Sequence, residues 1–400
     1  MLGLKHRWTR LRALDPQLRI FLVGIVLLSI SAGLNETTIN NFLRDRFGLG
    51  AQARGNLEFP RELPGFLTAL FAGLLFFVPE TKIAALSALL VAGGFVGLAH
   101  CGTDRSVMLI FLVLWSAGTH LMMPLRNSIS MELATKARQG TRLGQVRGVG
   151  IAGALIGCFL VWMIRPTQTA NYRLVFMLGA VVALAASLAF LAMRLPNARL
   201  KRPRFVWHRE YRLFYVLAFL FGARKHIFMT FGPWVLITVF DQPAHIFAQL
   251  WIVASVIGLW VQPLVGRLID RLGERLVLMV DSALIIVLCA GYGFSDHLQD
   301  HRLALGILYA CYVLDHLLFG LNMARATYMA KIAVKPEHIT PTLSLGVSID
   351  HVASMSMPAV GGLAWVAFGH SAVFIGAAGI AALMLVFANM IQTPGRGRAA

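Results

Sequence analysis

The chain alternates between long apolar runs and short polar segments, and within each run the apolar residues are continuous rather than every second one. Most runs hold about 20 residues or more, the length that a helix needs to cross ~30 Å of hydrocarbon. Continuous apolar helices satisfy their own backbone hydrogen bonds inside a bilayer, whereas the strands of a closed barrel show an alternating pattern. The sequence therefore predicts an all-α membrane protein with twelve transmembrane helices. The expected spans are 20–43, 54–78, 82–101, 106–133, 142–164, 172–193, 212–240, 244–265, 276–294, 302–330, 340–367 and 371–392.

The composition supports a membrane protein. Of 400 residues, 58% are hydrophobic and 14% are charged, whereas soluble domains carry about 25% charged residues. A net charge of +18 would suit a nucleic-acid partner, but the basic residues lie in the short polar segments and form no single patch, so no nucleic acid is expected. The four cysteines lie in or beside apolar runs without CxxC spacing, which indicates core residues rather than metal ligands. No cofactor is predicted.

The lysines and arginines predict the orientation of the chain. When the N-terminus is placed in the cytoplasm and the spans alternate, most basic residues fall in the cytoplasmic segments. This asymmetry follows the positive-inside rule. We therefore expect both termini in the cytoplasm of a bacterial-type inner membrane. The first run lacks a small-residue cleavage signature and is interpreted as an uncleaved span.

The longest polar segment divides the predicted spans into two sets of six. It covers 194–211 and carries Pro196 and Pro203. The predicted domains are an N-terminal six-helix bundle (1–193), a cytoplasmic linker loop (194–211) and a C-terminal six-helix bundle (212–400). Arg126 in the fourth span and Arg325 in the tenth lie at the same depth, a faint sign of internal repetition. The pattern fits two pseudo-symmetric, parallel repeats.

A motif follows the eighth span. The segment GRLIDRLGER at 266–275 resembles the loop between the second and third helices of a half in the major facilitator superfamily (MFS), whereas the corresponding segment 73–82 keeps little of that pattern. The resemblance implies a secondary transporter with alternating access, in which the first, fourth, seventh and tenth spans line a central cavity. It also implies that the motif loop holds one conformation. The gating residues that it assigns are Gly266, Asp270, Arg271, Gly273 and Arg275.

Charged residues inside the predicted spans are candidates for function, because a charge at the bilayer centre costs at least ~2.5–3.5 kcal/mol. The seventh span places three such residues in succession near the midplane. Successive helical residues point about 100° apart, so one is expected to face substrate while another packs against a neighbouring helix. A fixed cation there suits a small organic anion or zwitterion. The predicted substrate-binding residues are Arg224, Lys225, His226, Asn35, Glu36 and His120.

Acidic residues and histidines form a second group of candidates. Asp-His pairs lie near the midplane in the tenth and eleventh spans, and two glutamates lie in the outer half of the second span. Because histidine titrates near neutrality, a histidine beside a carboxylate suits a proton relay. A structural network with Arg224 or Lys225 and a divalent metal site are the other interpretations. The predicted proton-coupling residues are Asp315, His316, Asp350, His351, Glu58 and Glu62.

Two arginines lie toward the cytoplasmic ends of their spans, Arg126 in the fourth and Arg325 in the tenth. We expect both to form ion pairs at an inner gate. Arg126 is also similar, in residue type and depth, to the fourth-span arginine that the superfamily links to proton coupling.

These features together predict a transporter and not an enzyme. The chain has no GxxxxGK[ST] loop for direct ATP coupling and no HExxH or GxSxG motif. The expected function is proton-coupled transport of a small organic anion or zwitterion by a monomer, with the substrate, protons and the lipid bilayer as partners. Three alternatives stay open: a drug/proton efflux antiporter, a divalent metal carrier and a transporter-like sensor that moves nothing.

Overall fold

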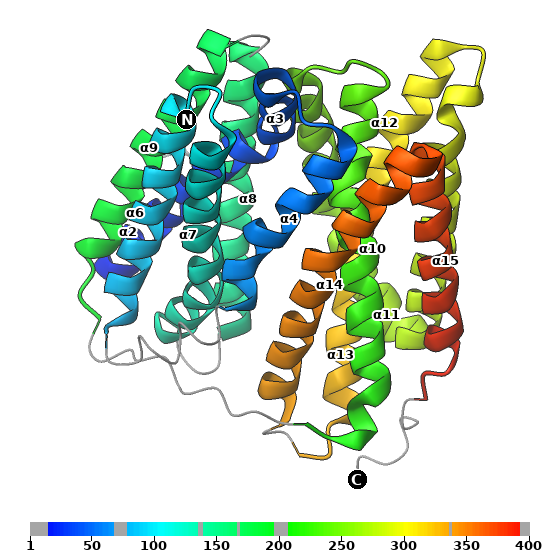
Figure 1. Cartoon of the computed structure of the whole chain (residues 1–400). Coiled ribbons are helices and arrows are strands. Elements are labelled where there is room, and N and C mark those ends of the chain that lie inside the picture. Colours follow the sequence, from blue (N-terminus) through cyan, green and yellow to red (C-terminus); the bar gives the residue numbers. More distant parts are fainter. Residues whose placement is uncertain are drawn as a thin grey trace, which may run out of the picture. The chain divides into compact units, whose positions relative to one another are not determined.

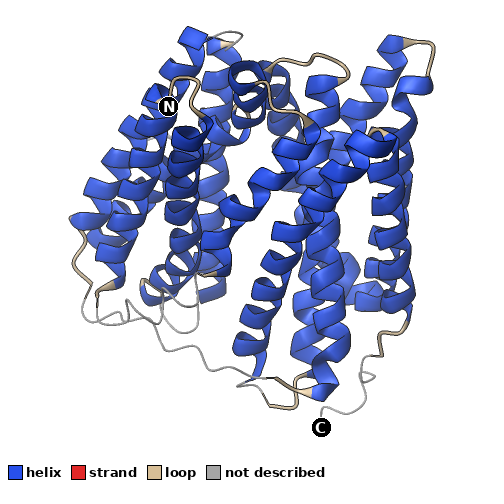
Figure 2. Ribbon diagram, viewed as in Figure 1, coloured by secondary structure: helices blue, strands red, loops and turns tan. Residues whose placement is uncertain are grey.

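The structure is a computed structural model that describes residues 15–67, 78–134, 139–165, 169–195, 207–335 and 338–392. Within this part of the chain the regular structure is helical and no strand occurs (Figure 2). Eleven of its helices are long and apolar enough to cross a membrane. The all-α membrane fold predicted from the sequence is confirmed. The predicted second span begins in a described helix, but its continuation at 68–77 lies outside the described residues, as does most of the predicted linker, 196–206.

The helices group into two compact units, each described by itself. Unit 1 comprises residues 1–39 and 67–202, and unit 2 comprises residues 40–66 and 203–400. Segment 40–66 therefore packs with the C-terminal helices, and the predicted division into six-helix bundles at 193 and 212 stays a prediction. The helices of unit 1 are α2 (Pro16–Glu36), α6 (Glu80–His100), α7 (Arg105–Glu132), α8 (Gln139–Ile164) and α9 (Thr169–Leu191) (Figure 1).

Unit 2 contains eight α-helices and three short 3₁₀ turns among its described residues. The α-helices are α3 (Ile39–Phe47, whose first residue lies in unit 1), α4 (Ala51–Phe66), α10 (Arg212–Thr238), α11 (Ala244–Phe294), α12 (His301–Leu318), α13 (Met323–Ile332), α14 (Ile339–Phe368) and α15 (His370–Asn389). The 3₁₀ turns are η2 (Arg209–Tyr211), η3 (Ser295–His297) and η4 (Phe319–Asn322).

Three helices begin after an aspartate that caps the N-terminus. The side chains of Asp15, Asp104 and Asp300 each accept hydrogen bonds from the backbone N–H groups two and three residues later. A carboxylate here satisfies N–H groups that have no partner in the first turn and complements the helix dipole. The caps thus fix where α2, α7 and α12 begin.

Glycines let α2 and α8 pack closely in unit 1. A Cβ atom on Gly153 would overlap the backbone of Val26, and one on Gly157 would overlap the carbonyl oxygen of Ile30. Small residues at helix contacts are the usual means by which membrane helices approach each other. Packing against α2 therefore explains the glycines at 153 and 157 of α8.

Glycines also let α4 and α14 pack closely in unit 2. A Cβ atom on Gly55 would overlap the carbonyl oxygen of Pro358, and one on Gly362 would press against the backbone of Gln52. The side-chain amide of Gln52 also donates to the carbonyl oxygen of Ala359 at 3.4 Å. This close contact places the acidic residues of α4 against α14.

Two helical segments of unit 2 contain an interruption. Within α11, Gly273 has φ 82° and ψ 162°, a left-handed φ that glycine adopts without steric cost, and this turn separates the predicted eighth and ninth spans. The predicted tenth span is broken by η4, which separates α12 from α13. There a Cβ atom on Gly320 would overlap the side chain of Gln262, so a glycine suits the close contact of η4 with α11.

Candidate functional site

A buried arginine on α10 is held by carboxylates from two other helices. Arg224 is 0% exposed, and its Nη1 donates to Oδ1 of Asp315 on α12 at 3.2 Å. Its Nη2 lies 3.9 Å from Oδ2 of Asp281 on α11. A charge inside a protein is tolerated when it is paired, and here two carboxylates face one guanidinium. Arg224 therefore ties α10 to α11 and α12.

The next residue along α10 pairs with a different helix. Nζ of Lys225 donates to Oδ2 of Asp350 on α14, and the two side chains are 12% and 15% exposed. Oδ1 of Asp350 lies against Gly222 and has no hydrogen-bond partner among the described residues. The divergent partners of Arg224 and Lys225 follow from the 100° between successive helical residues. The structure thus contains the ion-pair network that was one interpretation of the sequence.

An aromatic ring lies among these charges. The buried ring of Phe221 has its centroid 5.2 Å from Cζ of Arg224, 6.0 Å from Nζ of Lys225 and 3.8 Å from Cζ of Arg325. Cations are attracted to the face of an aromatic ring. Phe221 therefore links the two ion pairs of α10 to the arginine of α13.

That second arginine, Arg325, has different partners. Its Nε donates to Oδ1 of Asn322 at 2.7 Å, its Nη2 donates to the same oxygen, and its Nη1 donates to the carbonyl oxygen of Leu217 at 3.4 Å. It makes no ion pair with any described residue. Arg325, Asn322 and Asp350 line a cavity of about 220 Å³ between α10, α13 and α14, whose remaining walls are apolar.

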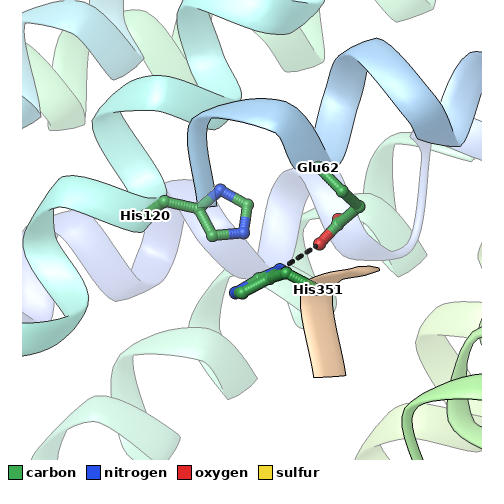
Figure 3. A group of neighbouring side chains, drawn as sticks. All are labelled: Glu62, His120 and His351. Atoms are coloured by element: carbon green, nitrogen blue, oxygen red, sulfur yellow. Dashed lines mark hydrogen bonds and ion pairs between the residues drawn. The ribbon is translucent and has the colours of Figure 1, made fainter. Parts of the chain in front are cut away.

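A second charged cluster joins α4 to α14. Glu58 is fully buried and accepts hydrogen bonds from Arg54 and Arg61. Arg61 also pairs with Glu62 at 2.8 Å. Figure 3 shows the carboxylate of Glu62 facing the ring of His351 on α14, with 3.1 Å between Oε2 and Nδ1. The structure therefore brings three of the predicted proton-coupling residues, Glu58, Glu62 and His351, into one cluster.

His226, the third charged or titratable residue in succession on α10, lies beside this cluster. It is 3% exposed, and its Nδ1 has no hydrogen-bond partner among the described residues. One potential ligand atom from each of Glu58, Glu62 and His226 lies within 4.8 Å of the others. The group thus offers two carboxylates and an imidazole in a buried place.

The remaining histidine of the predicted relay, His316, has its described contacts on its own helix. Its Nδ1 lies 3.0 Å from the carbonyl oxygen of Tyr312, and the two rings have their centroids 4.5 Å apart. Its chain neighbour Asp315 pairs with Arg224 instead. Both aspartates of the predicted Asp-His pairs therefore form ion pairs with α10. Of the two histidines, only His351 joins the cluster of α4 among the described contacts.

The predicted site residues of unit 1 lie in separate surroundings. Asn35 is buried with Oδ1 unpartnered among the described residues, whereas Glu36 is exposed. Nδ1 of His120, a residue also drawn in Figure 3, lies 3.0 Å from a serine hydroxyl one turn earlier on α7. Arg126 lines a cavity of about 130 Å³ between α2, α6 and α7.

The motif at 266–275 lies where α11 turns. Arg275 donates through Nη2 to Oδ1 of Asn389 on α15 at 2.5 Å, and the buried Glu274 pairs with Lys331 of α13 at 2.7 Å. Gly266, Asp270 and Arg271 lie on the helical turns before Gly273. These contacts attach the turn to α13 and α15, and its role in gating stays a prediction.

Several residues of these clusters are absent from the sequence-based prediction, among them Asp281, Arg54 and Asn322. Asp281 is an acidic residue inside a predicted span, and the cost of such a charge is a signal that identifies it. Arg54 is four residues before Glu58, the spacing of a helical ion pair. Asn322 lies three residues before Arg325, which is also a helical contact spacing, but a neutral amide carries no charge that would mark it as a candidate.

Apolar helices with ion pairs buried between them and a small cavity beside those charges are typical of membrane transport proteins. The chain belongs to the Major Facilitator Superfamily, whose sequence model matches residues 21–335. The protein is accordingly a multi-pass membrane transporter of a small-molecule substrate rather than an enzyme, and the resemblance carried by the motif at 266–275 is confirmed.

Solved transporter structures have the same fold. The nucleoside transporter NupG matches with a TM-score of 0.73 and 14% identity, over 95% of this chain and 100% of that chain. The xylose transporter XylE from E. coli, in an inward open conformation, matches with a TM-score of 0.69 and 14% identity, over 94% and 96%. A bacterial homolog of the human lysosomal transporter Spinster matches with a TM-score of 0.69 and 15% identity, over 93% and 94%. No curated protein matches the chain in sequence.

Proposed function

We propose that the protein is a proton-coupled secondary carrier that moves a small organic anion or zwitterion by alternating access. In this proposal it acts as a monomer in a bacterial inner membrane, with both termini in the cytoplasm. The observation that supports it most directly is the buried pair Glu62–His351, which places two titratable groups in contact where α4 packs on α14.

The position of this pair suggests how proton binding would drive a conformational change. Glu62 bonds to Arg61 and to His351, and its side chain is 4% exposed. A proton on the carboxylate removes its negative charge and so weakens both bonds, since charge-assisted hydrogen bonds are stronger than neutral ones. The proton would thereby weaken the attachment of α4 to α14. A ligand that weakens one conformation shifts the equilibrium toward the other, and a proton gradient can use this shift to drive transport.

The cavity of unit 2 favours a small, charged solute over a drug-like one. Charged groups inside membrane bundles commonly mark the path of a substrate or ion, and Lys225, Asp350 and Arg325 lie at or beside this cavity. Its volume of about 220 Å³ is below the roughly 300–1,000 Å³ typical of sites for drug-sized ligands. Transport of a small organic ion is therefore the better supported function.

Reconstituted protein tests the coupling. In proteoliposomes, a panel of carboxylates and amino acids is assayed for counterflow and for accumulation driven by a pH gradient. Glu62→Gln keeps the size of the side chain but cannot exchange a proton, so it should retain counterflow and lose gradient-driven accumulation. The matched control is Glu210→Gln, whose side chain is 64% exposed before α10, and it should behave as the natural protein does.

Two results would contradict the proposal. Undiminished gradient-driven accumulation in Glu62→Gln would exclude Glu62 as the coupling site. Absence of counterflow for every solute in the natural protein would favour a transporter-like sensor.

A divalent metal carrier is the second candidate, and the positions of Glu58, Glu62 and His226 favour it. Carboxylates and imidazoles bind several divalent transition metals. However, Arg54 and Arg61 already bind the oxygens of Glu58, so a metal ion would have to displace an arginine. Calorimetric titration with Mn²⁺ and Zn²⁺ separates the two candidates. Stoichiometric binding that is lost in His226→Ala would support the metal carrier.

A further inference from the structure

We propose that Arg325 binds the carboxylate of a small monoanionic solute in the cavity of unit 2. This inference rests on the proposed transport function and narrows its substrate class from organic anions and zwitterions to small monocarboxylates. It also gives Arg325 a role in binding, in addition to the gating role expected from its depth in the span.

The cavity has a polar end and an apolar body. Apolar side chains of α10 and α14 form its walls, and the polar groups gather at Asn322, Arg325 and Asp350. A volume of about 220 Å³ corresponds to roughly seven water molecules at ~30 Å³ each. Such a space suits a carboxylate with a short hydrocarbon chain. The apolar wall residues are Phe214, Ala218, Ala326, Leu343 and Val347.

Arg325 is better placed to bind an anion than the other cations nearby. Arg224 has no exposed surface and is held by two carboxylates, and Lys225 is held by Asp350. A solute anion could reach either one only by leaving a protein carboxylate without its partner. The described hydrogen-bond acceptors of Arg325 are neutral oxygens. A guanidinium bonds more strongly to a carboxylate than to an amide oxygen, so Arg325 retains capacity for an anion.

The charges around the cavity specify how many negative charges the solute carries. Lys225 neutralises Asp350, and Arg224 lies between Asp281 and Asp315 outside the cavity lining. Among the described residues, Arg325 is therefore the one charged group of the lining that is not in an ion pair, and it offers a single positive charge to a solute. A monoanion neutralises this charge. A zwitterion leaves it unchanged, and a dianion reverses it beside the carboxylate of Asp350. Electrostatics therefore favours a single carboxylate over both of these classes.

Two neighbours orient the guanidinium for this role. Oδ1 of Asn322 accepts hydrogen bonds from Nε and Nη2, and the ring centroid of Phe221 lies 3.8 Å from Cζ. Nη1 makes a longer bond of 3.4 Å to a backbone carbonyl. Nε and Nη2 thus hold the side chain in place, whereas Nη1 makes the longest of its hydrogen bonds and is the nitrogen most readily given to a solute. Asn322 acts here as a positioning residue.

The first experiment measures which class of solute binds. Purified full-length protein is titrated with acetate, propionate and butyrate, with the amides of these acids, with glycine and alanine as zwitterions, and with succinate as a dianion. Binding is followed by thermal shift and by currents on solid-supported membranes. We expect the monocarboxylates to bind, and we expect their neutral amides to bind at least tenfold more weakly.

The second experiment assigns the binding to Arg325. Arg325→Gln should weaken binding of the monocarboxylate by about 10- to 100-fold, the effect of losing a hydrogen bond to a charged group. Asn322→Asp keeps the shape of the side chain but gives Arg325 a carboxylate within the protein, so it should weaken binding to a similar extent without unfolding the chain. Arg302→Gln, on the exposed first turn of α12, is the matched control and should bind as the natural protein does.

The outcomes separate this inference from the proposed function. Three results overturn the inference. The first is stronger binding of glycine or succinate than of any monocarboxylate, and the second is no binding of any monocarboxylate. The third is unchanged monocarboxylate binding in both Arg325→Gln and Asn322→Asp. Proton-driven transport of a zwitterion would also overturn the inference while leaving the proposed function in place. Conversely, monocarboxylate binding that depends on Arg325, together with transport that ignores the pH gradient, supports the inference and contradicts proton coupling.

Discussion

The two units of the chain stabilise their interiors in different ways. Unit 2 contains ion pairs between helices that are far apart in sequence, such as Arg224–Asp315 and Lys225–Asp350. The interior of unit 1 has single hydrogen bonds between neighbouring helices, for example from Ser128 to Glu80 at 2.8 Å, beside the close contact of α2 and α8. Ion pairs buried in the membrane are expensive to build. Among the described residues, the ion pairs between helices are therefore concentrated in unit 2.

The arginines of the predicted repeat show the same difference. Arg126 and Arg325 each line a cavity of their own unit. Arg325 is fixed by Asn322 and by the ring of Phe221, whereas Arg126 has an exposed side chain within its unit. Both positions thus hold an arginine that lines a cavity of its own unit, but the described groups that orient Arg325 have no counterpart among the described contacts of Arg126. A repeat can keep a residue while its surroundings diverge.

Removal of the buried arginine of unit 2 should have the largest effect on stability. Arg224→Leu leaves Asp281 and Asp315 buried without a counter-charge, and breaking a buried pair in this way costs about 3–5 kcal/mol. Arg126→Leu, an exposed position outside any described ion pair, should change the free energy of unfolding by about 0.5 kcal/mol or less. Unfolding in detergent measures both values. Similar losses in the two variants would remove the contrast between the units.

Glycine contacts should have an intermediate effect that is the same in both units. Gly55→Leu in unit 2 and Gly157→Leu in unit 1 place side-chain atoms against a backbone carbonyl of the facing helix. Overpacking of this kind costs about 1–3 kcal/mol. Gly148→Ala, whose Cβ would meet no described atom within 4 Å, is the control on α8 and should be neutral or stabilise by about 0.5–1 kcal/mol. A loss of stability in only one of the two leucine variants would show that the two units do not depend equally on close helix packing.

The smallest effect is expected for the hydrogen bond of unit 1. Ser128→Ala removes the donor to the buried carboxylate of Glu80 and should cost about 0.5–1.5 kcal/mol. The thermal midpoint and the detergent unfolding curve measure this loss. A loss as large as that of Arg224→Leu would mean that unit 1 also depends on a buried polar network.

Most of the fold could be predicted from the sequence, and the site only in part. The spans, the turn between 265 and 276 and the family follow from local features of the chain. The charged residues of the site were also visible as polar positions inside apolar runs. Their partners were not, because Arg224 and Lys225 are adjacent and chemically similar in the sequence. One bonds to α11 and α12 and the other to α14.

The apolar pattern alone establishes a helical membrane protein, because insertion of a span depends on the summed hydrophobicity of its own residues. Tertiary packing decides the rest. It attaches 40–66 to the C-terminal helices through Gly55, joins Glu62 to His351, and leaves Arg325 without a described carboxylate partner. Spacing along a helix fixes the direction of a side chain. Which helix lies in that direction depends on contacts between segments hundreds of residues apart, and no local pattern encodes them.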